Sequence, residues 1–562
     1  MRCTRLQIAC LLVTGYSGLF AQTIDSVRRI RERIDNNVSV ALQNNRAAKA
    51  APQFDRGAAD PQFVLSDLAF LFKPSSDQQA DLDQFLGDVQ NPASGIYHQW
   101  LTPEQYADRF GLSAADVNQV AEWLQAQGFQ VTYHARGRNW IAFSGSAAQV
   151  EAAFRTAIHR YLVDGEEHFA NRTDPSIPVA LAAVVSAIRG LDNFRLNPAQ
   201  RQRSMVRRVQ PDFNDGTGFH FLAPDDLAAI YDLNSLYSVG IDGSGQKVAV
   251  AGQTDVVLSD IAAFRSIFNL PANAPQLVLY GRDPGTRSGD QSEAEMDLEW
   301  TGAVARNATV LYVYSTDVFN SVQYAVDQNL APVISMSYGG CENDNTGVLQ
   351  TYRNLAQQAA AEGISWLASS GDTGAAACDS SSSSSASRGP SVMFPASIPE
   401  VTAVGGTEFV DGAGSYWNST NGANQGSAVG YIPETTWNDT SRNGTLTASG
   451  GGASISFAAP SYQTGAGFPN NGFRNVPDVS LTASADHDGY IMCVAPTNCP
   501  SNWRSLGEGS GYTVVGGTSA SVQVFGGILT LINHYLASSG LQSKAGLGSA
   551  NQALYWLAQN SP

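Results

Sequence analysis

Four short apolar runs in the second half of the chain constrain the fold more than any other feature. They are continuous rather than alternating, and they cover Val248–Ala251, Thr309–Val313, Val333–Met336 and Ile364–Ala368. A strand that is buried on both faces has this pattern, which is typical of parallel sheets. Segments with helical spacing, such as residues 320–328 and 348–362, lie between the runs. We therefore predict an α/β domain with a mostly parallel sheet.

The N-terminal part has a different pattern. Strand-like segments at 62–66, 130–133 and 140–143 alternate with helical segments at 116–127 and 147–157. A further helix is expected to begin at Pro103, capped by Thr102. This order of elements predicts an α+β unit of the ferredoxin-like type.

The apolar periodicity stops in the Arg-rich stretch 195–220, which predicts an exposed linker, either a cleavage segment or an ordinary interdomain tether. The expected organisation is a signal peptide at 1–21, an α+β propeptide at 22–200, a linker at 201–221 and a main domain at 222–562. The signal peptide is inferred from Arg2 and Arg5, the apolar run 6–20 and the small residue Ala21. Because no later stretch has the length of a membrane span, we expect a soluble exported protein.

The net charge is −17, which argues against nucleic-acid binding. Residues 223–562 hold 11 basic and 28 acidic side chains, whereas residues 1–222 hold equal numbers of each. A domain so rich in carboxyl groups would suit work at low pH, although plain solubility explains the charge equally well.

Four cysteines remain after the expected signal peptide: Cys341, Cys378, Cys493 and Cys499. In an exported chain they predict two disulfides, with Cys493 and Cys499 closing one loop and Cys341 paired with Cys378. A zinc site is the alternative, but the spacing of the cysteines does not match one.

The cluster Gly516–Ser521 is followed by an apolar helical run, which is how a nucleophilic serine, Ser519, would be presented. A Gly/Ser turn that merely caps a helix is the alternative. A serine nucleophile needs a base, but none of the three histidines after residue 219, namely His220, His487 and His534, lies in a motif.

Carboxyl groups are the other candidate bases. Glu293 and Asp297 are four residues apart on one expected helix, so they share a face and can share one proton. Such a Glu could accept the serine proton while the Asp orients it. A solvated acidic face is the alternative, and we expect Glu295 and Glu299 to be solvated in this way. Asp372 follows the run that ends at Ala368, where a protonated carboxyl could stabilise an oxyanion or simply form an Asx-turn.

These residues, in the motifs Glu293-x-x-x-Asp297, Ser-Gly-Asp372 and Gly-Thr-Ser519-Ala-Ser, resemble the sedolisin (serine-carboxyl peptidase) family. Residues 97–106 resemble the family's activation propeptide of the pro-kumamolisin type. The resemblance implies a subtilisin-like fold and a secreted zymogen that cleaves peptide bonds in acid. It assigns Ser519 as nucleophile, Glu293 as base, Asp297 as its partner and Asp372 as oxyanion stabiliser. Family members include endopeptidases and tripeptidyl-peptidases, and we expect an endopeptidase.

The family's calcium site lies after the nucleophile, but no Asp or Glu occurs between Glu508 and Pro562. Calcium prefers carboxylate ligands, so we expect no metal or other cofactor to be held by this chain. The expected partners are peptide substrates and the chain's own propeptide, with no nucleic acid and no membrane after signal removal, and the expected state is a monomer.

Two other functions remain open. A non-catalytic secreted binding protein on a peptidase scaffold would fit the missing calcium segment, whereas the retained Ser519, Glu293, Asp297 and Asp372 oppose it. A neutral, histidine-dependent peptidase would need a histidine motif, and the sequence offers none.

Overall fold

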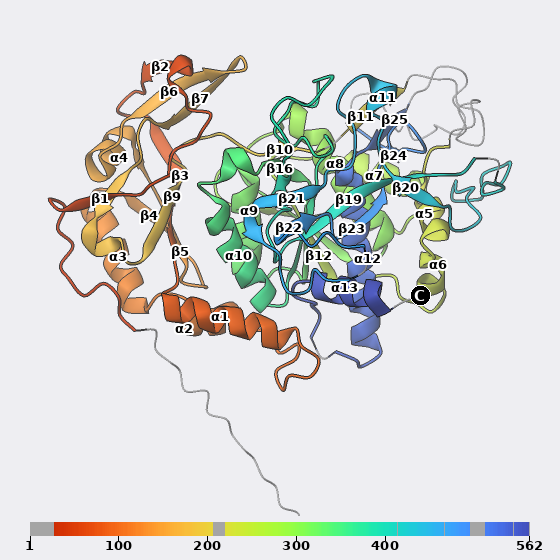
Figure 1. Cartoon of the computed structure of the whole chain (residues 1–562), viewed down its shortest axis with the longest axis horizontal. Helices are drawn as coiled ribbons and strands as arrows, with labels where there is room; N and C mark the ends of the chain where they lie inside the picture. Colours follow the sequence, from red (N-terminus) through yellow and green to blue (C-terminus); the bar gives the residue numbers. More distant parts are fainter. Residues whose placement is uncertain are drawn as a thin grey trace, which may run out of the picture.

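The computed structural model describes residues 27–199, 201–205, 220–412, 414–465, 467–494, 512–542 and 544–560. Two units lie side by side, the N-terminal unit (residues 27–199) and the C-terminal domain (residues 220–560) (Figure 1). The expected signal peptide, Cys499 and most of the expected linker lie outside the described residues.

An eight-stranded sheet forms the centre of the C-terminal domain. Its order is β13-β14-β12-β15-β17-β19-β20, and β23 also pairs with β19. Its neighbouring strands pair in parallel, except that β20 pairs antiparallel with β19. The bounds are β12 Lys247–Gly252, β13 Gln276–Leu279, β14 Thr309–Tyr314, β15 Val333–Met336, β17 Ser365–Ser369, β19 Thr402–Phe409, β20 Glu434–Thr436 and β23 Val479–Thr482. The predicted mostly parallel sheet is confirmed.

Helices cover both faces of this sheet, as the unbroken apolar runs require. Val248 and Val250 of β12 face one core together with α8 (Ser288–Val304) and α12 (Thr518–Ser538). Ala249 and Ala251 face a second core. That core includes α9 (Val318–Asp327) and α10 (Leu349–Ala361). Further helices of the domain are α5 Pro224–Ile230, α6 Leu233–Ser238, α7 Leu258–Ile267, α11 Thr440–Asn443 and α13 Asn551–Asn560.

The N-terminal unit contains a four-stranded antiparallel sheet in the order β4-β5-β3-β9. Its strands are β3 Val64–Phe72, β4 Gln130–His134, β5 Trp140–Ser146 and β9 Val185–Arg189, and its helices are α1 Ser76–Val89, α2 Pro103–Phe110, α3 Ala114–Ala126 and α4 Ala147–Phe154. In sequence order this is the arrangement 4-1-3-2 with helical crossovers, so the ferredoxin-like prediction is confirmed. Thr102 caps α2 in a capping box with Gln105, and Pro103 opens the helix.

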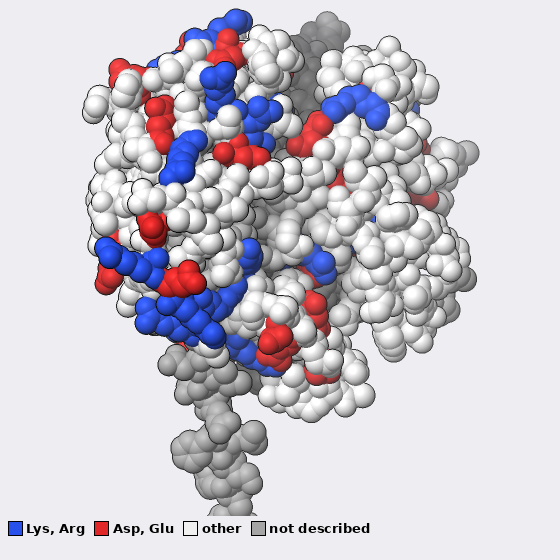
Figure 2. Space-filling model, turned by 60° about the vertical axis from the view of Figure 1, so that its left-hand side comes forward, with Lys and Arg blue, Asp and Glu red and all other residues white. Residues whose placement is uncertain are grey.

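The two units share an apolar contact and several hydrogen bonds. Phe85 and Trp100 pack in one cluster with Ala361, at the end of α10. The indole N–H of Trp100 donates to the carbonyl oxygen of Gly546 at 3.1 Å. The buried carboxylate of Asp327 accepts from the Tyr133 hydroxyl at 2.6 Å. Figure 2 shows charged side chains of both signs on one face, with several Lys and Arg side chains gathered at its lower left.

Candidate active site

Two packed helices, α8 and α12, bring together residues more than 220 positions apart in the sequence. Glu293, Asp297 and Thr301 recur every four residues on α8, and Ser519 and Gln523 are four residues apart on α12. Residues at this spacing lie on one face of a helix. All five are fully buried, although they are polar, and they form a polar seam between the two helices. We call these five residues the polar seam below.

A glycine on α12 permits this close approach. A Cβ on Gly527 would lie 2.5 Å from the Cβ of Val304 on α8, so only glycine fits the contact without a shift. The neighbouring Gly526 is less crowded, since its nearest atom would lie 3.5 Å away. The helices therefore pack closely enough for side chains on α8 to reach those on α12.

Ser519 is presented by a turn that requires glycine. Strand β25 (Tyr512–Gly516) ends at Gly516, where a Cβ would clash with the carbonyl oxygen of Ala483. Gly517 follows with φ of 103°, in the region that favours glycine. Ser519 is then the second residue of α12, next to the positive end of the helix dipole. The predicted glycine turn and the helix after it are present, and strand β25 precedes them.

Glu293 and Asp297 are completely buried, and burial raises the pKa of each well above its ordinary value. The charge of Asp297 raises the pKa of Glu293 further, while the Ser519 hydroxyl lowers it. No hydrogen bond within 3.5 Å joins Ser519 Oγ or either Glu293 oxygen to a described residue. Ser519 is thus close enough to Glu293 to affect its ionisation, although the two side chains are not within hydrogen-bond distance.

Asp297 belongs to a hydrogen-bond chain that our reading of the sequence missed. The Ser337 hydroxyl donates to Asp297 Oδ1 at 2.8 Å, and Gln523 Nε2 donates to Ser337 Oγ at 2.8 Å. Gln523 Oε1 in turn accepts from the hydroxyls of Thr301 and Ser335, at 2.7 and 2.6 Å. The four-residue spacing of Ser519 and Gln523 on a helix was the one signal in the sequence that could have indicated Gln523.

Asp372 lies beyond β17, next to the start of α12. Its Oδ1 accepts from the backbone N–H and from the hydroxyl of Thr518, both at 2.9 Å. Its charge also contributes to the raised pKa of Glu293. All four residues singled out in the sequence are therefore brought to one place, around the N-terminus of α12.

The prediction for Glu295 and Glu299 is wrong, because neither is solvated. Both are fully buried. Glu295 Oε1 accepts from the backbone N–H of Val257 at 3.0 Å, and Glu299 accepts from the backbone N–H of Cys493 at 3.1 Å. The reason is that α8 is covered on every side, by the sheet, α7, α12 and β24 (Tyr490–Met492). Burial raises the pKa of Glu295 to about 7.

Tyr338 and His534 lie outside the hydrogen bonds of the polar seam. The hydroxyl of Tyr338 is buried and makes no hydrogen bond to a residue that the structure describes, so it does not extend the carboxyl network. His534 is 15 residues after Ser519 on the same helix, about 22 Å away at 1.5 Å per residue. Its Nδ1 accepts from Gly243 N at 3.1 Å, so it cannot serve Ser519 as a base.

The chain that joins the two units runs past this site as two short strands. β10 (Asn197–Pro198) pairs antiparallel with β16 (Tyr338–Cys341), and Ala199 N donates to the carbonyl oxygen of Ser337 at 2.9 Å. β11 (Arg201–Met205) then pairs antiparallel with β25, the strand that leads to Ser519. We call residues 197–199 and 201–205 the connecting segment. These residues have regular backbone pairing at two strand edges, which the loss of apolar periodicity did not predict, while their role as a linker stays a prediction.

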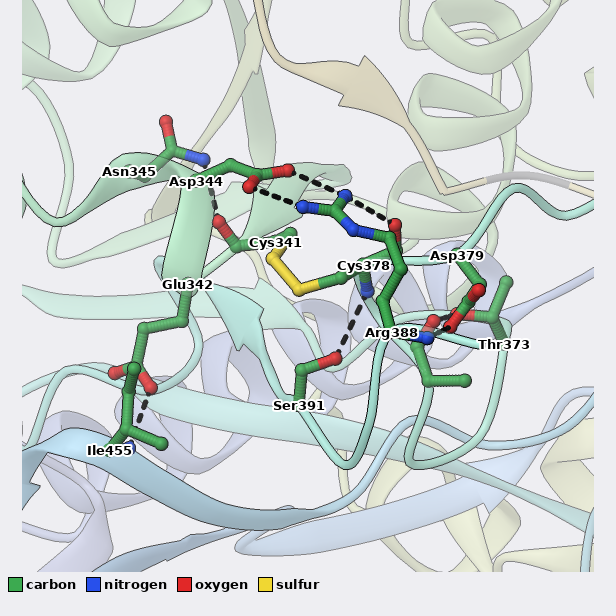
Figure 3. The surroundings of a disulfide bond; sticks show 11 residues. Cys341, Glu342, Asp344, Asn345, Thr373, Cys378, Asp379, Arg388, Ser391 and Ile455 are labelled. Carbon is green, nitrogen blue, oxygen red and sulfur yellow. Dashed lines mark hydrogen bonds and ion pairs between the residues drawn. A yellow bond between two sulfur atoms is a disulfide. The ribbon is translucent and has the colours of Figure 1, made fainter. Parts of the chain in front are cut away.

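A cleft of about 940 Å³ lies between the units, and the connecting segment, Cys341, Asp372 and Met393 contribute to its walls. The predicted disulfide Cys341–Cys378 is present at its edge (Figure 3). Arg388 braces it, with bonds to Asp344 at 2.7 and 2.9 Å and to the Cys378 carbonyl at 2.7 Å. The bridge therefore ties β16 to the loop that follows Asp372. Cys493 is also disulfide-bonded, but Cys499 lies outside the described residues.

Comparison with known proteins agrees with the resemblance. Residues 55–194 match the family model described as "Pro-kumamolisin, activation domain". This match covers most of the N-terminal unit.

Curated relatives match most of the chain. Tripeptidyl-peptidase 1 of Homo sapiens is 30% identical over 89% of this chain and 84% of its own length. Sedolisin of Pseudomonas sp. (strain 101) is 28% identical over 88% of this chain and 80% of its own length.

Solved structures were also found. Pseudomonas sedolisin complexed with two molecules of pseudo-iodotyrostatin has 25% identity and a TM-score of 0.47, covering 61% of this chain and 87% of that chain. Fervidolysin from Fervidobacterium pennivorans, described as related to subtilisin, has 10% identity and a TM-score of 0.37, covering 85% of this chain and 55% of that chain. The extent of the match to tripeptidyl-peptidase 1, together with the activation domain, shows that the protein belongs to the sedolisin family of serine-carboxyl peptidases, as a member with a zymogen activation domain.

Proposed function

We propose that this protein is a secreted zymogen that matures into an endopeptidase active in acid, with Ser519 as nucleophile and Glu293 as its base. The observation that carries the proposal is the polar seam, in which buried carboxyl groups on α8 face the serine on α12. In the proposed reaction Ser519 Oγ bonds to the carbonyl carbon of the peptide, and its proton passes to the Glu293 carboxylate. Glu293 then gives that proton to the leaving amine, and water reverses the steps to release the second product.

Asp297 would position Glu293 and hold a proton for it. Two adjacent buried carboxyl groups cannot both ionise readily, so the pair keeps one proton over a range of pH where single carboxyl groups are ionised. Ser337 donates to Asp297 Oδ1, while Oδ2 has no hydrogen-bond partner among the described residues. The shared proton can therefore sit on Oδ2 and leave Glu293 ionised to act as base. This requirement for one retained proton favours activity in acid.

Asp372 would stabilise the oxyanion of the tetrahedral intermediate. Thr518 fixes the side chain through its backbone N–H and its hydroxyl, both on Oδ1. In its protonated form the carboxyl group can donate a hydrogen bond to the developing negative charge.

The connecting segment supports two parts of the proposal. It pairs with β16 and β25, the strand edges that a peptide substrate would use, so the zymogen would be inhibited by its own chain. The chain also continues on both sides of the site rather than ending near it. A cleft that accepts a continuous chain favours an endopeptidase over a tripeptidyl-peptidase, which remains the alternative because relatives of that name match the chain.

Secretion rests on the signal-like pattern of residues 1–21. Among the helices that the structure describes, none combines the length and apolar character needed to cross a bilayer.

Self-processing tests the proposal. The purified full-length chain is brought to roughly pH 4, where a carboxyl pair can keep one proton. We expect loss of the N-terminal unit and cleavage of an internally quenched peptide whose amino terminus is blocked. Ser519→Ala should abolish both, whereas His534→Gln should change neither. An unprocessed wild-type chain that a peptide aldehyde does not label at Ser519 would instead support the non-catalytic binding protein. Cleavage restricted to peptides with a free amino terminus would support the tripeptidyl-peptidase.

A further inference from the structure

A cluster of histidine and aspartate side chains outside the polar seam is not used by the proposed reaction. His220 lies just before α5, Asp411 just after β19, and Asp488 just before β24. One potential ligand atom from each of the three lies within 4.8 Å of the others. Segments separated by up to 268 residues in sequence therefore present nitrogen and oxygen donors to one point.

We propose that His220, Asp411 and Asp488 bind one divalent transition-metal ion of the Zn²⁺ class. A tetrahedral zinc site has bonds of about 2.0–2.2 Å, so its ligand atoms lie roughly 3.3–3.6 Å apart. His220 Nδ1 lies 3.9 Å from Asp488 Oδ1, within a small side-chain adjustment of that separation. One imidazole and two carboxylates suit zinc better than calcium, which takes about 6–8 oxygen ligands.

His487 lies beside these three residues. Its Nε2 is 3.4 Å from Asp411 Oδ1 and 3.6 Å from Asp488 Oδ2. It can orient the two carboxylates around the ion, as residues adjoining metal ligands commonly do.

The site is organised before any ion arrives. Asp488 is 1% exposed, and its Oδ1 accepts from the backbone N–H of His220 at 2.7 Å. Its Oδ2 receives no hydrogen bond from the residues described, so one oxygen of this buried carboxylate remains available to an ion. The ring of His220 stacks on Trp417, with centroids 4.1 Å apart and planes 12° from parallel, which fixes its orientation.

Solvent can reach the cluster. The side chains of His220, His487 and Asp411 are 14%, 13% and 17% exposed, so an ion can enter from that side. Once bound, it would join the first described residues of the C-terminal domain to the loops before β24 and after β19. Leu222 forms a bridge with Tyr490 of β24, and β24 pairs with β25. The ion would thus strengthen the attachment of the chain that follows the connecting segment.

Metal titration tests this site independently of peptidase activity. The full-length Ser519→Ala chain is treated with a chelator and titrated at neutral pH with Co²⁺, followed by visible absorption, and with Zn²⁺, followed by calorimetry. We expect one ion to bind per chain with micromolar or tighter affinity. Bound Co²⁺ should show the intense visible absorption that is typical of low coordination number. His220→Gln and Asp411→Asn should each weaken binding by at least tenfold, as loss of a ligand does.

His534→Gln is the matched control. His534 also lies near a carboxylate, with Nδ1 3.9 Å from Asp242 Oδ1, but it belongs to no such group in the part of the chain that the structure describes. This variant should bind as the parent does. A thermal scan with Zn²⁺ guards against misfolded variants, because the ion should raise the Tm of the parent and of His534→Gln but not of the two ligand variants. Absence of stoichiometric binding by the parent, or equal affinity in all variants, would overturn the proposal, and so would binding of Ca²⁺ without Zn²⁺.

Discussion

Replacing Glu295 by Gln should make the stability of this protein less dependent on pH. Burial raises the pKa of Glu295 from 4.5 to about 7 in the folded chain. Below the pKa of the unfolded state, the Glu295 carboxyl group is neutral in both the folded and the unfolded chain, so its ionisation does not affect the free energy of unfolding. As the pH rises from about 4.5 through about 7, the folded state holds a proton that the unfolded state has lost, so this group makes the free energy of unfolding fall with increasing pH.

The size of the effect follows from the shift. At about 1.4 kcal/mol per pKa unit, a shift of about 2.5 units makes the folded protein roughly 3 kcal/mol less stable above pH 7 than below pH 4.5. Glutamine removes the ionisation and keeps an oxygen that can accept from Val257 N. Between about pH 4 and about pH 8, the free energy of unfolding of the variant should therefore fall by about 3 kcal/mol less than that of the parent.

Urea unfolding at these two pH values, in a Ser519→Ala background that cannot digest itself, measures the difference. Asp232→Asn is the control, since it is also an acid-to-amide change in the C-terminal domain but at an exposed position. Its pH dependence should match that of the parent. If Glu295→Gln and Asp232→Asn differ by less than about 0.5 kcal/mol in their change with pH, burial is not what governs this carboxyl group.

Three further changes test the geometry. Gln523→Leu should lower kcat by roughly ten- to a hundredfold with little change in KM, because it removes the donor to Ser337 beneath Asp297; an unchanged kcat would contradict that role. Gly527→Ala should destabilise the protein by about 1–3 kcal/mol in chemical unfolding through overpacking, whereas Gly526→Ala should be tolerated, and equal effects would contradict the close helix contact. Replacing Cys341 and Cys378 together by Ser should lower the free energy of unfolding by about 4 kcal/mol, because the bridge closes a loop across 37 residues. The same change should raise KM by loosening β16, and an unchanged KM would show that the bridge does not affect peptide binding.

The sequence was most informative for features that depend on a single helix or a single turn. The spacing of Glu293 and Asp297 predicts a shared helix face, and the glycines before Ser519 predict its turn, and both features are present. The catalytic roles themselves stay predictions, as do the domain boundaries, whereas the expectation that the chain holds no metal conflicts with the site proposed at His220, Asp411 and Asp488.

Features that depend on contacts between distant segments could not be predicted in this way. Ser337 becomes part of the site only because β15 ends beside α8, which no local pattern records. The burial of Glu295 and Glu299 follows from packing around the whole of α8, whereas acidic residues on a helix are usually exposed. The connecting segment forms strands through backbone pairing at open edges, so its side chains need not show strand periodicity.

The covalent continuity of the connecting segment has a kinetic consequence. If the connecting segment inhibits the enzyme as proposed, then in the intact chain it competes with substrate at an effective concentration set by the tether, which dilution does not change. A cut in this segment turns the same contact into an encounter between two molecules. From that moment the fraction of the N-terminal fragment that stays bound depends on protein concentration, so after the cut a dilute preparation should reach a higher active fraction than a concentrated one.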